Sequence, residues 1–297
     1  MCGIVGYLGK NDCVENIKEG LLSVEYRGYD SAGISYIHDG AIQIQKRVGS
    51  VANLFDSITC PKDTHCGIGH TRWATHGEVC EKNAHPHISF DNRFSLVHNG
   101  IIENYAVIKD GILKDVPFRT NVDTECIVNL VAYFCKVNPK LSDLEAFCEA
   151  LKNLEGSYAI AMLALDTPDT IYFARKESPL LIGKGDKETF ISSDVLGLGK
   201  SCSEYVVVPN GVYGYINKEE IKAFGEGKKE VNLVFKSMIS HSERAQKGDN
   251  AHFMQKEINE IPTVIENTVK IYLNEDNPIS KVEKGFWQNI EKIEFIA

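Results

Sequence analysis

The sequence contains no long apolar run, no block of charges of one sign and no pair of cysteines in a C-x-x-C arrangement. Its longest nearly apolar stretch is residues 158–165, whereas a membrane-spanning helix needs about 20 apolar residues. The chain begins without basic residues, and its first apolar run stops at Lys10, which is too short for a secretion signal. These absences predict a cytoplasmic protein with no membrane partner.

Basic residues are in the minority, with 32 Lys and Arg against 41 Asp and Glu and a formal net charge of −9 at pH 7. Proteins that bind nucleic acid neutralise its phosphates with a basic face, so this charge balance argues against a nucleic-acid partner. The nine cysteines are odd in number, which together with their spacing disfavours both a disulfide framework and a thiolate zinc site. What remains is a chain of 297 residues that is 43% hydrophobic, enough for one large domain or two ordinary ones.

The hydrophobic pattern predicts an α+β protein with antiparallel sheets covered by helices. A buried strand at 3–8 precedes a helix at 12–27, and a His-Asp-Gly turn joins two short strands into a hairpin, the sign of antiparallel pairing. The second half lacks the helix after each strand that a parallel sheet requires. Further strands are expected at 33–37, 41–45, 67–72, 93–98, 157–165, 170–174, 179–182, 189–192, 205–209 and 211–216, and helices at 123–136 and 142–153.

The composition changes near residue 240. Residues 240–250 are polar and read as a linker, and residues 253–273 follow with a helical pattern. Pro262 lies in the middle of that pattern, which predicts a kink or two shorter helices. The last residues, 293–297, resemble the beginning of a strand and suggest that a further domain is missing. One apolar stripe needs a partner surface: Met254, Ile258, Ile261, Ile265, Val269 and Tyr272.

Cys2 directly follows the initiator methionine, and its small side chain favours removal of Met1. The first residue would then hold both a thiol and a free α-amine. The α-amine has a reference pKa of about 7.7–8.0, so its neutral fraction can take the thiol proton near pH 7. Cys2 is therefore a candidate self-contained nucleophile and base. A cysteine at this position by accident is the alternative if the residue is considered alone.

Six motifs decide between these readings. They are MCGIVG at 1–6, YRGYDSAG at 26–33, HTRWATHG at 70–77, NAHPH at 83–87, VHNGIIEN at 97–104 and DTE at 123–125. In this order and spacing they closely resemble the glutaminase domain of the glutamine:fructose-6-phosphate amidotransferase family, over about residues 2–240. The resemblance implies an N-terminal-nucleophile hydrolase fold, a four-layer α/β/β/α sandwich.

The resemblance also implies a site. Cys2 attacks the side-chain amide of glutamine, and the Asn99 side chain with the backbone N–H of Gly100, expected in a loop, forms the oxyanion hole. Arg27 orients the N-terminal residue or is structural. Free glutamine carries an ammonium and a carboxylate, for which Asp123 and Arg72 are the matching partners. The remaining pocket residues and the covering loop are expected at Trp73, Thr75, His76 and Gly77.

No metal or cofactor is expected. His70, His76, His85 and His87 lie close to Cys80 in the sequence, but the His-Pro-His spacing matches no standard zinc pattern. A glutaminase with a cysteine nucleophile requires no metal.

Residues 2–240 are thus expected to be a class II glutaminase domain that releases glutamate and ammonia from L-glutamine. Residues 241–297 are expected to be a linker and helical segment leading to an absent sugar-phosphate isomerase domain. Fructose 6-phosphate would be aminated to glucosamine 6-phosphate only through that absent domain or a separate one, and a homodimer is compatible with the sequence. Two alternatives remain: a non-catalytic glutamine-binding or regulatory module, and the glutaminase half of another amidotransferase.

Overall fold

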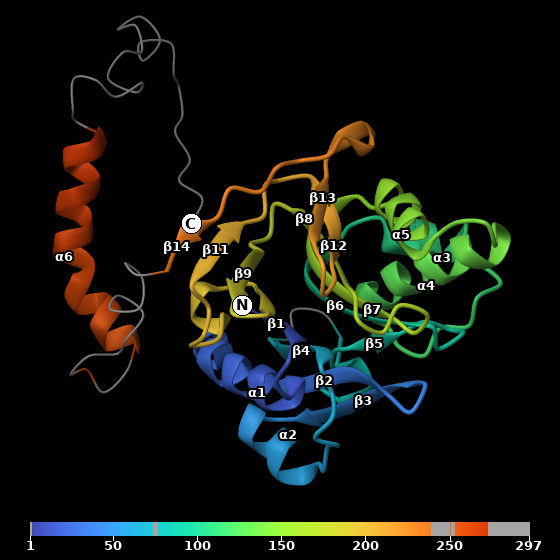
Figure 1. Ribbon diagram of the computed structural model, residues 1–297, viewed down its shortest axis with the longest axis horizontal. Helices are drawn as coiled ribbons and strands as arrows, with labels where there is room; N and C mark the ends of the chain where they lie inside the picture. Colours follow the sequence, from blue (N-terminus) through green and yellow to red (C-terminus); the bar gives the residue numbers. More distant parts are fainter. Residues whose placement is uncertain (1, 74–76, 239–249, 251–252, 273–297) are drawn as a thin grey trace, which may run out of the picture. The chain divides into compact units, whose positions relative to one another are not determined.

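A computed structural model of the chain describes residues 2–73, 77–238, 250 and 253–272. The chain divides into two compact units, Met1–Ala245 and Gln246–Ala297. The first unit contains two antiparallel sheets and the helices that cover them (Figure 1). The second unit contains the helix α6 (Phe253–Tyr272).

The larger sheet has eight strands in the order β14-β11-β9-β10-β1-β4-β2-β3. Its centre is β1, which pairs antiparallel with β10 on one side and with β4 on the other. The hairpin predicted around His-Asp-Gly is present, with Asp39 and Gly40 both at positive φ in the turn. The strands are β1 (Gly3–Gly9), β2 (Ser31–His38), β3 (Ala41–Val48), β4 (Cys66–Arg72), β9 (Leu181–Gly185), β10 (Glu188–Ser192), β11 (Glu204–Val207) and β14 (Lys236–Ser237).

The smaller sheet has six strands in the order β13-β12-β8-β7-β6-β5. Its long central pair, β6 and β7, runs antiparallel from Phe94 opposite Ala164 to Ile102 opposite Gly156. The strand β6 continues through Gly100, so the expectation that this glycine lies in a loop is wrong. The strands are β5 (His87–Ile88), β6 (Phe94–Ile102), β7 (Gly156–Ala164), β8 (Ile171–Lys176), β12 (Val212–Ile216) and β13 (Ile221–Phe224).

Helices cover the outer face of each sheet. On the larger sheet lie α1 (Cys13–Val24) and α2 (Val51–Ser57), and on the smaller sheet lie α4 (Asp123–Val137) and α5 (Asp143–Lys152). Ser142 caps α5 in a capping box with Glu145, which satisfies backbone N–H groups at the helix start. The short helices are α3 (Tyr105–Asp110) and the 3-10 turns η1 (Glu25–Arg27), η2 (Glu81–Asn83), η3 (Val195–Gly197) and η4 (Glu226–Lys228).

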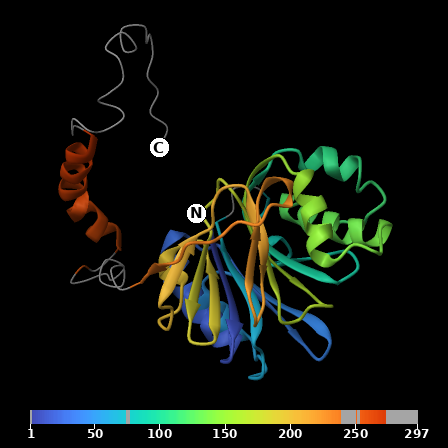
Figure 2. The same cartoon turned by 45° about the horizontal axis from the view of Figure 1, so that its top comes forward.

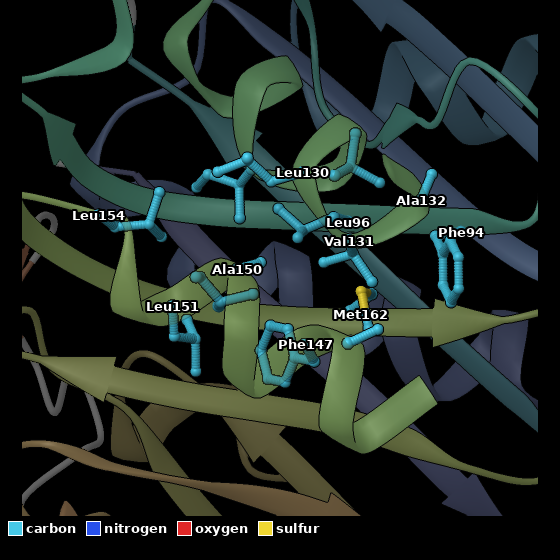
Figure 3. Close-up of a cluster of buried hydrophobic side chains, with 14 of the residues drawn as sticks. Phe94, Leu96, Leu130, Val131, Ala132, Phe147, Ala150, Leu151, Leu154 and Met162 are labelled. Carbon is cyan, nitrogen blue, oxygen red and sulfur yellow. The ribbon is translucent and has the colours of Figure 1, made fainter. Parts of the chain in front are cut away.

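Successive side chains of a strand point to opposite faces of its sheet, and apolar side chains on both faces form three hydrophobic cores. In β7, Ile160 and Met162 face α4 and α5, whereas Ala161 and Leu163 belong to the core between the two sheets. Figure 3 shows the first of these cores, in which Phe147 packs over the strands. Because both faces of the central strands are buried, the strands read as nearly continuous apolar runs. The predicted four-layer α/β/β/α sandwich with antiparallel sheets is confirmed, and its layers are visible in Figure 2.

The helix α6 is a single element of 20 residues that contains Pro262 in its interior. The expectation of two shorter helices is therefore wrong, because a proline removes only one backbone hydrogen bond and the turns on either side still form. In this helix Met254 is 70% exposed and Ile265 is 56% exposed. The expected strand at 293–297 lies outside the described residues. No helix within the described ranges is long and apolar enough to cross a membrane.

Candidate active site

A cavity of 340 Å³ lies where β1, β4, β6 and the start of α4 come together. The antiparallel pairing of Gly3 with Thr71 brings Cys2 beside the end of β4, which continues into Trp73. The first turn of α4 contributes Asp123 from the far side. Six residues predicted from the sequence line the cavity: Cys2, Arg72, Trp73, Gly77, Gly100 and Asp123.

The Cys2 thiol is half-buried and contacts the backbone of Trp73. Its Sγ accepts a hydrogen bond from the Trp73 N–H at 3.3 Å and lies 3.6 Å from the Trp73 carbonyl oxygen. Burial raises the pKa of this thiol above its ordinary value, although the Trp73 N–H opposes the shift. A thiol that is protonated at neutral pH requires a base before it can act as a nucleophile.

Asn99 lies next to Cys2 and is held from two directions. Its Nδ2 donates to the Cys2 carbonyl oxygen at 3.2 Å, and its Oδ1 lies 2.9 Å from Nε2 of His70. The next residue, Gly100, has a φ of 131°, and a Cβ built there would lie 2.0 Å from the Ser157 carbonyl oxygen. Only glycine fits this backbone, and Gly100 lines the cavity. Asn99 does not line the cavity itself, so of these two predicted donors it adjoins the site only through its hydrogen bond to Cys2.

Behind these donors lies a group of buried histidines. The rings of His70 and His85 stack with centroids 4.1 Å apart, and His98 Nδ1 lies 3.0 Å from Thr124 Oγ1. Burial lowers the pKa of His70 to about 3, and it also lowers the pKa of His85 and His98. The rings are therefore neutral near pH 7, and they support the site without adding charge.

Two opposite charges face the cavity. The Asp123 carboxylate accepts hydrogen bonds from the N–H groups of Ile102 at 2.8 Å and Thr124 at 2.9 Å. Arg72 is only 5% exposed, and its guanidinium lies 3.5 Å from the Glu78 carbonyl oxygen. A fixed anion and a fixed cation in one small cavity suit a ligand with an ammonium and a carboxylate.

Three of the predicted side chains lie outside the described part of the chain. Thr75 and His76 lie outside the described residues, as does the side chain of Arg27 at the end of η1. Among the described parts of the chain, no group of three His, Cys, Asp or Glu side chains is arranged to hold a metal ion.

Sequence reasoning missed the histidines that support the donors. His70 lies on the same face of β4 as the buried Ile68, and His98 lies on the same face of β6 as the buried Leu96. This alternation could have indicated that both rings are buried. It also missed part of the cavity wall: His85, His98, Ile101, Ile102, Glu103, Tyr105, Asn121, Val122 and Thr124.

Comparison with known sequences gives a consistent family. Residues 70–199 match the family described as "Glutamine amidotransferase domain". The chain is 39% identical to a glutamine–fructose-6-phosphate aminotransferase (isomerizing) of Fusobacterium nucleatum, over 100% of this chain and 49% of the relative. It is 41% identical to the enzyme of the same name from Bacillus cereus, over 94% of this chain and 46% of the relative. The chain thus spans about half the length of the curated relatives it matches.

Solved structures support the same fold. Glutamine phosphoribosylpyrophosphate amidotransferase from B. subtilis superposes with a TM-score of 0.65 at 24% identity, covering 77% of this chain and 50% of that one. A structure described as the allosteric regulatory enzyme of purine biosynthesis gives the same TM-score and identity, over 75% and 48% of the two chains. These likenesses concern the fold alone. The sequence matches show that this chain carries a class II glutamine amidotransferase domain.

Proposed function

We propose that this chain hydrolyses the side-chain amide of L-glutamine through Cys2, after removal of Met1. The observation that supports this most strongly is one cavity lined by Cys2, Gly100, Arg72 and Asp123, with the Asn99 amide hydrogen-bonded to the Cys2 carbonyl oxygen beside it. A volume of 340 Å³ suits a ligand as small as one amino acid.

The first half of the reaction forms a thioester. The α-amine of Cys2 takes the thiol proton, and Sγ attacks the side-chain carbonyl carbon of glutamine. The negative charge that develops on the carbonyl oxygen is stabilised by the Asn99 Nδ2–H and the Gly100 N–H. When the tetrahedral intermediate collapses, the carbon–nitrogen bond breaks, and the protonated α-amine returns its proton to the departing ammonia.

The second half releases glutamate. The α-amine now takes a proton from water, whose oxygen attacks the thioester carbonyl carbon in the same oxyanion hole. The carbon–sulfur bond breaks and Cys2 recovers its proton. Throughout both steps, Asp123 binds the α-ammonium of the substrate and Arg72 grips its α-carboxylate, which fixes the amide over Sγ.

The relatives named as glutamine–fructose-6-phosphate aminotransferases suggest the destination of the ammonia. We propose that it aminates fructose 6-phosphate to glucosamine 6-phosphate in a sugar-phosphate isomerase domain, on the same polypeptide or a separate one. The glutaminase proposal does not depend on this acceptor.

Glutamate release from L-glutamine tests the proposal, using protein whose N-terminal mass confirms the loss of Met1. We expect turnover by the wild-type chain and none by Cys2→Ala. The matched control is Cys80→Ala, which removes another free, half-buried thiol outside the cavity and should retain activity. Tight glutamine binding without any turnover would instead favour a non-catalytic binding module.

A further inference from the structure

A second cavity, of 410 Å³, adjoins the same histidine group as the glutamine cavity. It is lined by β3 and β5, each the edge strand of its sheet, together with η2 and the start of α4. It shares no lining residue with the glutamine cavity. His87 lines this second cavity and His85 lines the first, and their rings are 4.7 Å apart.

The second cavity is rich in positive charge although the chain is acidic overall. Its lining contains four basic and two acidic side chains, and both acidic side chains already have partners. The Glu125 carboxylate accepts hydrogen bonds from the backbone N–H of Arg119 at 2.6 Å and from the backbone N–H and the hydroxyl of Thr120 at 2.6 and 2.7 Å. Glu81 lies 3.7 Å from Arg47.

Within the described residues, neither Arg119 nor Lys46 forms an ion pair with a carboxylate. Arg119 donates to the Asn92 side-chain oxygen at 2.9 Å and lies 3.5 Å from the Phe90 carbonyl oxygen, both of which are neutral. The Lys46 ammonium forms no hydrogen bond or ion pair with any residue that the structure describes. Such a cation, partly withdrawn from water, is costly unless an anion joins it.

Burial dominates the environment of Lys46. It lowers the pKa of this amine to about 8, despite the opposing attraction of Glu125 and Cys80, while Arg119 adds to the lowering. The nearby His87 is buried, and burial holds its pKa well below the ordinary value, so it supplies no charge near pH 7. An anion in the cavity would relieve the repulsion between Lys46 and Arg119.

We propose that this second cavity binds a small phosphoryl anion, held by the Lys46 ammonium and the Arg119 guanidinium. The planar guanidinium can bind two oxygens of a phosphoryl group, and the ammonium adds a compact point charge. The excess of two positive charges matches a doubly charged anion. The volume exceeds that of phosphate alone and leaves room for the body of a small metabolite. This site is independent of glutamine hydrolysis.

Isothermal titration of the full chain with inorganic phosphate and with glucose 6-phosphate tests the site, at ionic strength matched with potassium chloride. We expect saturable binding to the wild type and at least tenfold weaker binding to Lys46→Met. The matched control is Lys62→Gln, an exposed lysine outside the cavity, which should bind like the wild type. Tighter binding of glucose 6-phosphate identifies a phosphorylated metabolite, and equal binding identifies free phosphate. No saturable binding of either probe, or equal binding to Lys46→Met, would overturn the proposal.

A pH series with sulfate separates a specific role of Lys46 from loss of folding in its variant. Sulfate keeps its charge between pH 7 and 9, whereas an amine with a pKa of about 8 loses most of its protons. Binding to the wild type should therefore weaken by about tenfold from pH 7 to 9. Lys46→Arg stays charged and should bind at both pH values alike. An equal pH dependence in both proteins would show that Lys46 is not a ligand.

Discussion

Nε2 of His70 lies 2.9 Å from Oδ1 of Asn99, and this contact fixes which end of the amide faces Cys2. Burial lowers the pKa of His70 to about 3, so the ring is neutral at pH 7 and carries one proton. Because Oδ1 can only accept, that proton is assigned to Nε2, and Asn99 must turn Nδ2 toward the Cys2 carbonyl oxygen, 3.2 Å away. A flipped amide would present an oxygen to the developing oxyanion and repel it.

His70→Ala should therefore lower kcat for glutamine hydrolysis by roughly tenfold to a hundredfold, less than the loss of an oxyanion donor itself. KM should change little, because His70 does not line the glutamine cavity. Steady-state kinetics of glutamate release measure both. His70→Gln, whose side-chain amide can also donate to Asn99, is the control and should recover part of kcat. A fall in stability with unchanged kcat would make His70 a purely structural residue.

Gly100→Ala should both destabilise the protein and reduce turnover. A methyl group at φ 131° meets the Ser157 carbonyl oxygen, so we expect a loss of roughly 3 kcal/mol or more in the free energy of unfolding. Gly211→Ala is the matched control, because Gly211 also has positive φ but nothing within 4 Å of the new Cβ; its cost should be about 1 kcal/mol. Urea denaturation measures both. Equal costs would show that the close approach to Ser157 is relieved easily.

Asp123→Asn should raise KM for glutamine by about tenfold to a hundredfold, since a charged hydrogen bond contributes about 1.5–3 kcal/mol. The asparagine can still accept from the Ile102 N–H, so the start of α4 should remain intact. Glu103→Gln also removes a carboxylate from the cavity wall and is expected to leave KM within about threefold. If Asp123→Asn lowers the Tm while KM stays constant, its role is limited to the helix start.

Acid should destabilise the chain through its buried histidines. The folded-state pKa of His70, His85, His87 and His98 is lowered by burial, so below the ordinary value of about 6.5 the unfolded state binds more protons. Stability should fall with pH from about 6.5 toward 3, by up to about 1.4 kcal/mol per pH unit for each histidine. Urea denaturation at pH 7, 6 and 5 checks the slope. His87→Leu should make it shallower, whereas substitution of the exposed His65 should not. An equal slope in His87→Leu would contradict this origin.

Much of the sandwich could be predicted from local pattern. Alternation and turn chemistry identified the β2–β3 hairpin, and the helix expected at 142–153 corresponds to α5. The short strand β5 was missed because two residues carry no period. The order of strands depends on pairings between distant segments, such as β1 with β10, which no local pattern encodes.

The site could be predicted only as separate motifs. The sequence motifs identified Cys2, Asn99 and Asp123 by resemblance, but not the hydrogen bond from His70 that orients Asn99. Alternation along β4 and β6 could have indicated that His70 and His98 are buried, but not which side chain each ring contacts. The role of Lys46 could not be predicted from the sequence either. Whether a lysine has a carboxylate partner depends on the fold, and here Glu125 is hydrogen-bonded to other groups.

The identity of the cysteine that reacts at the glutamine site tests the central claim most directly. A chloroketone analogue of glutamine should alkylate the thiol that lies at the glutamine amide, and peptide mass mapping can distinguish all nine cysteines. We predict one adduct per chain, on Cys2 with a free α-amine, blocked by excess L-glutamine and absent from Cys2→Ala. Glutamine-protected labelling of another cysteine, or equal labelling of Cys2→Ala, would contradict the assignment of Cys2 as the nucleophile.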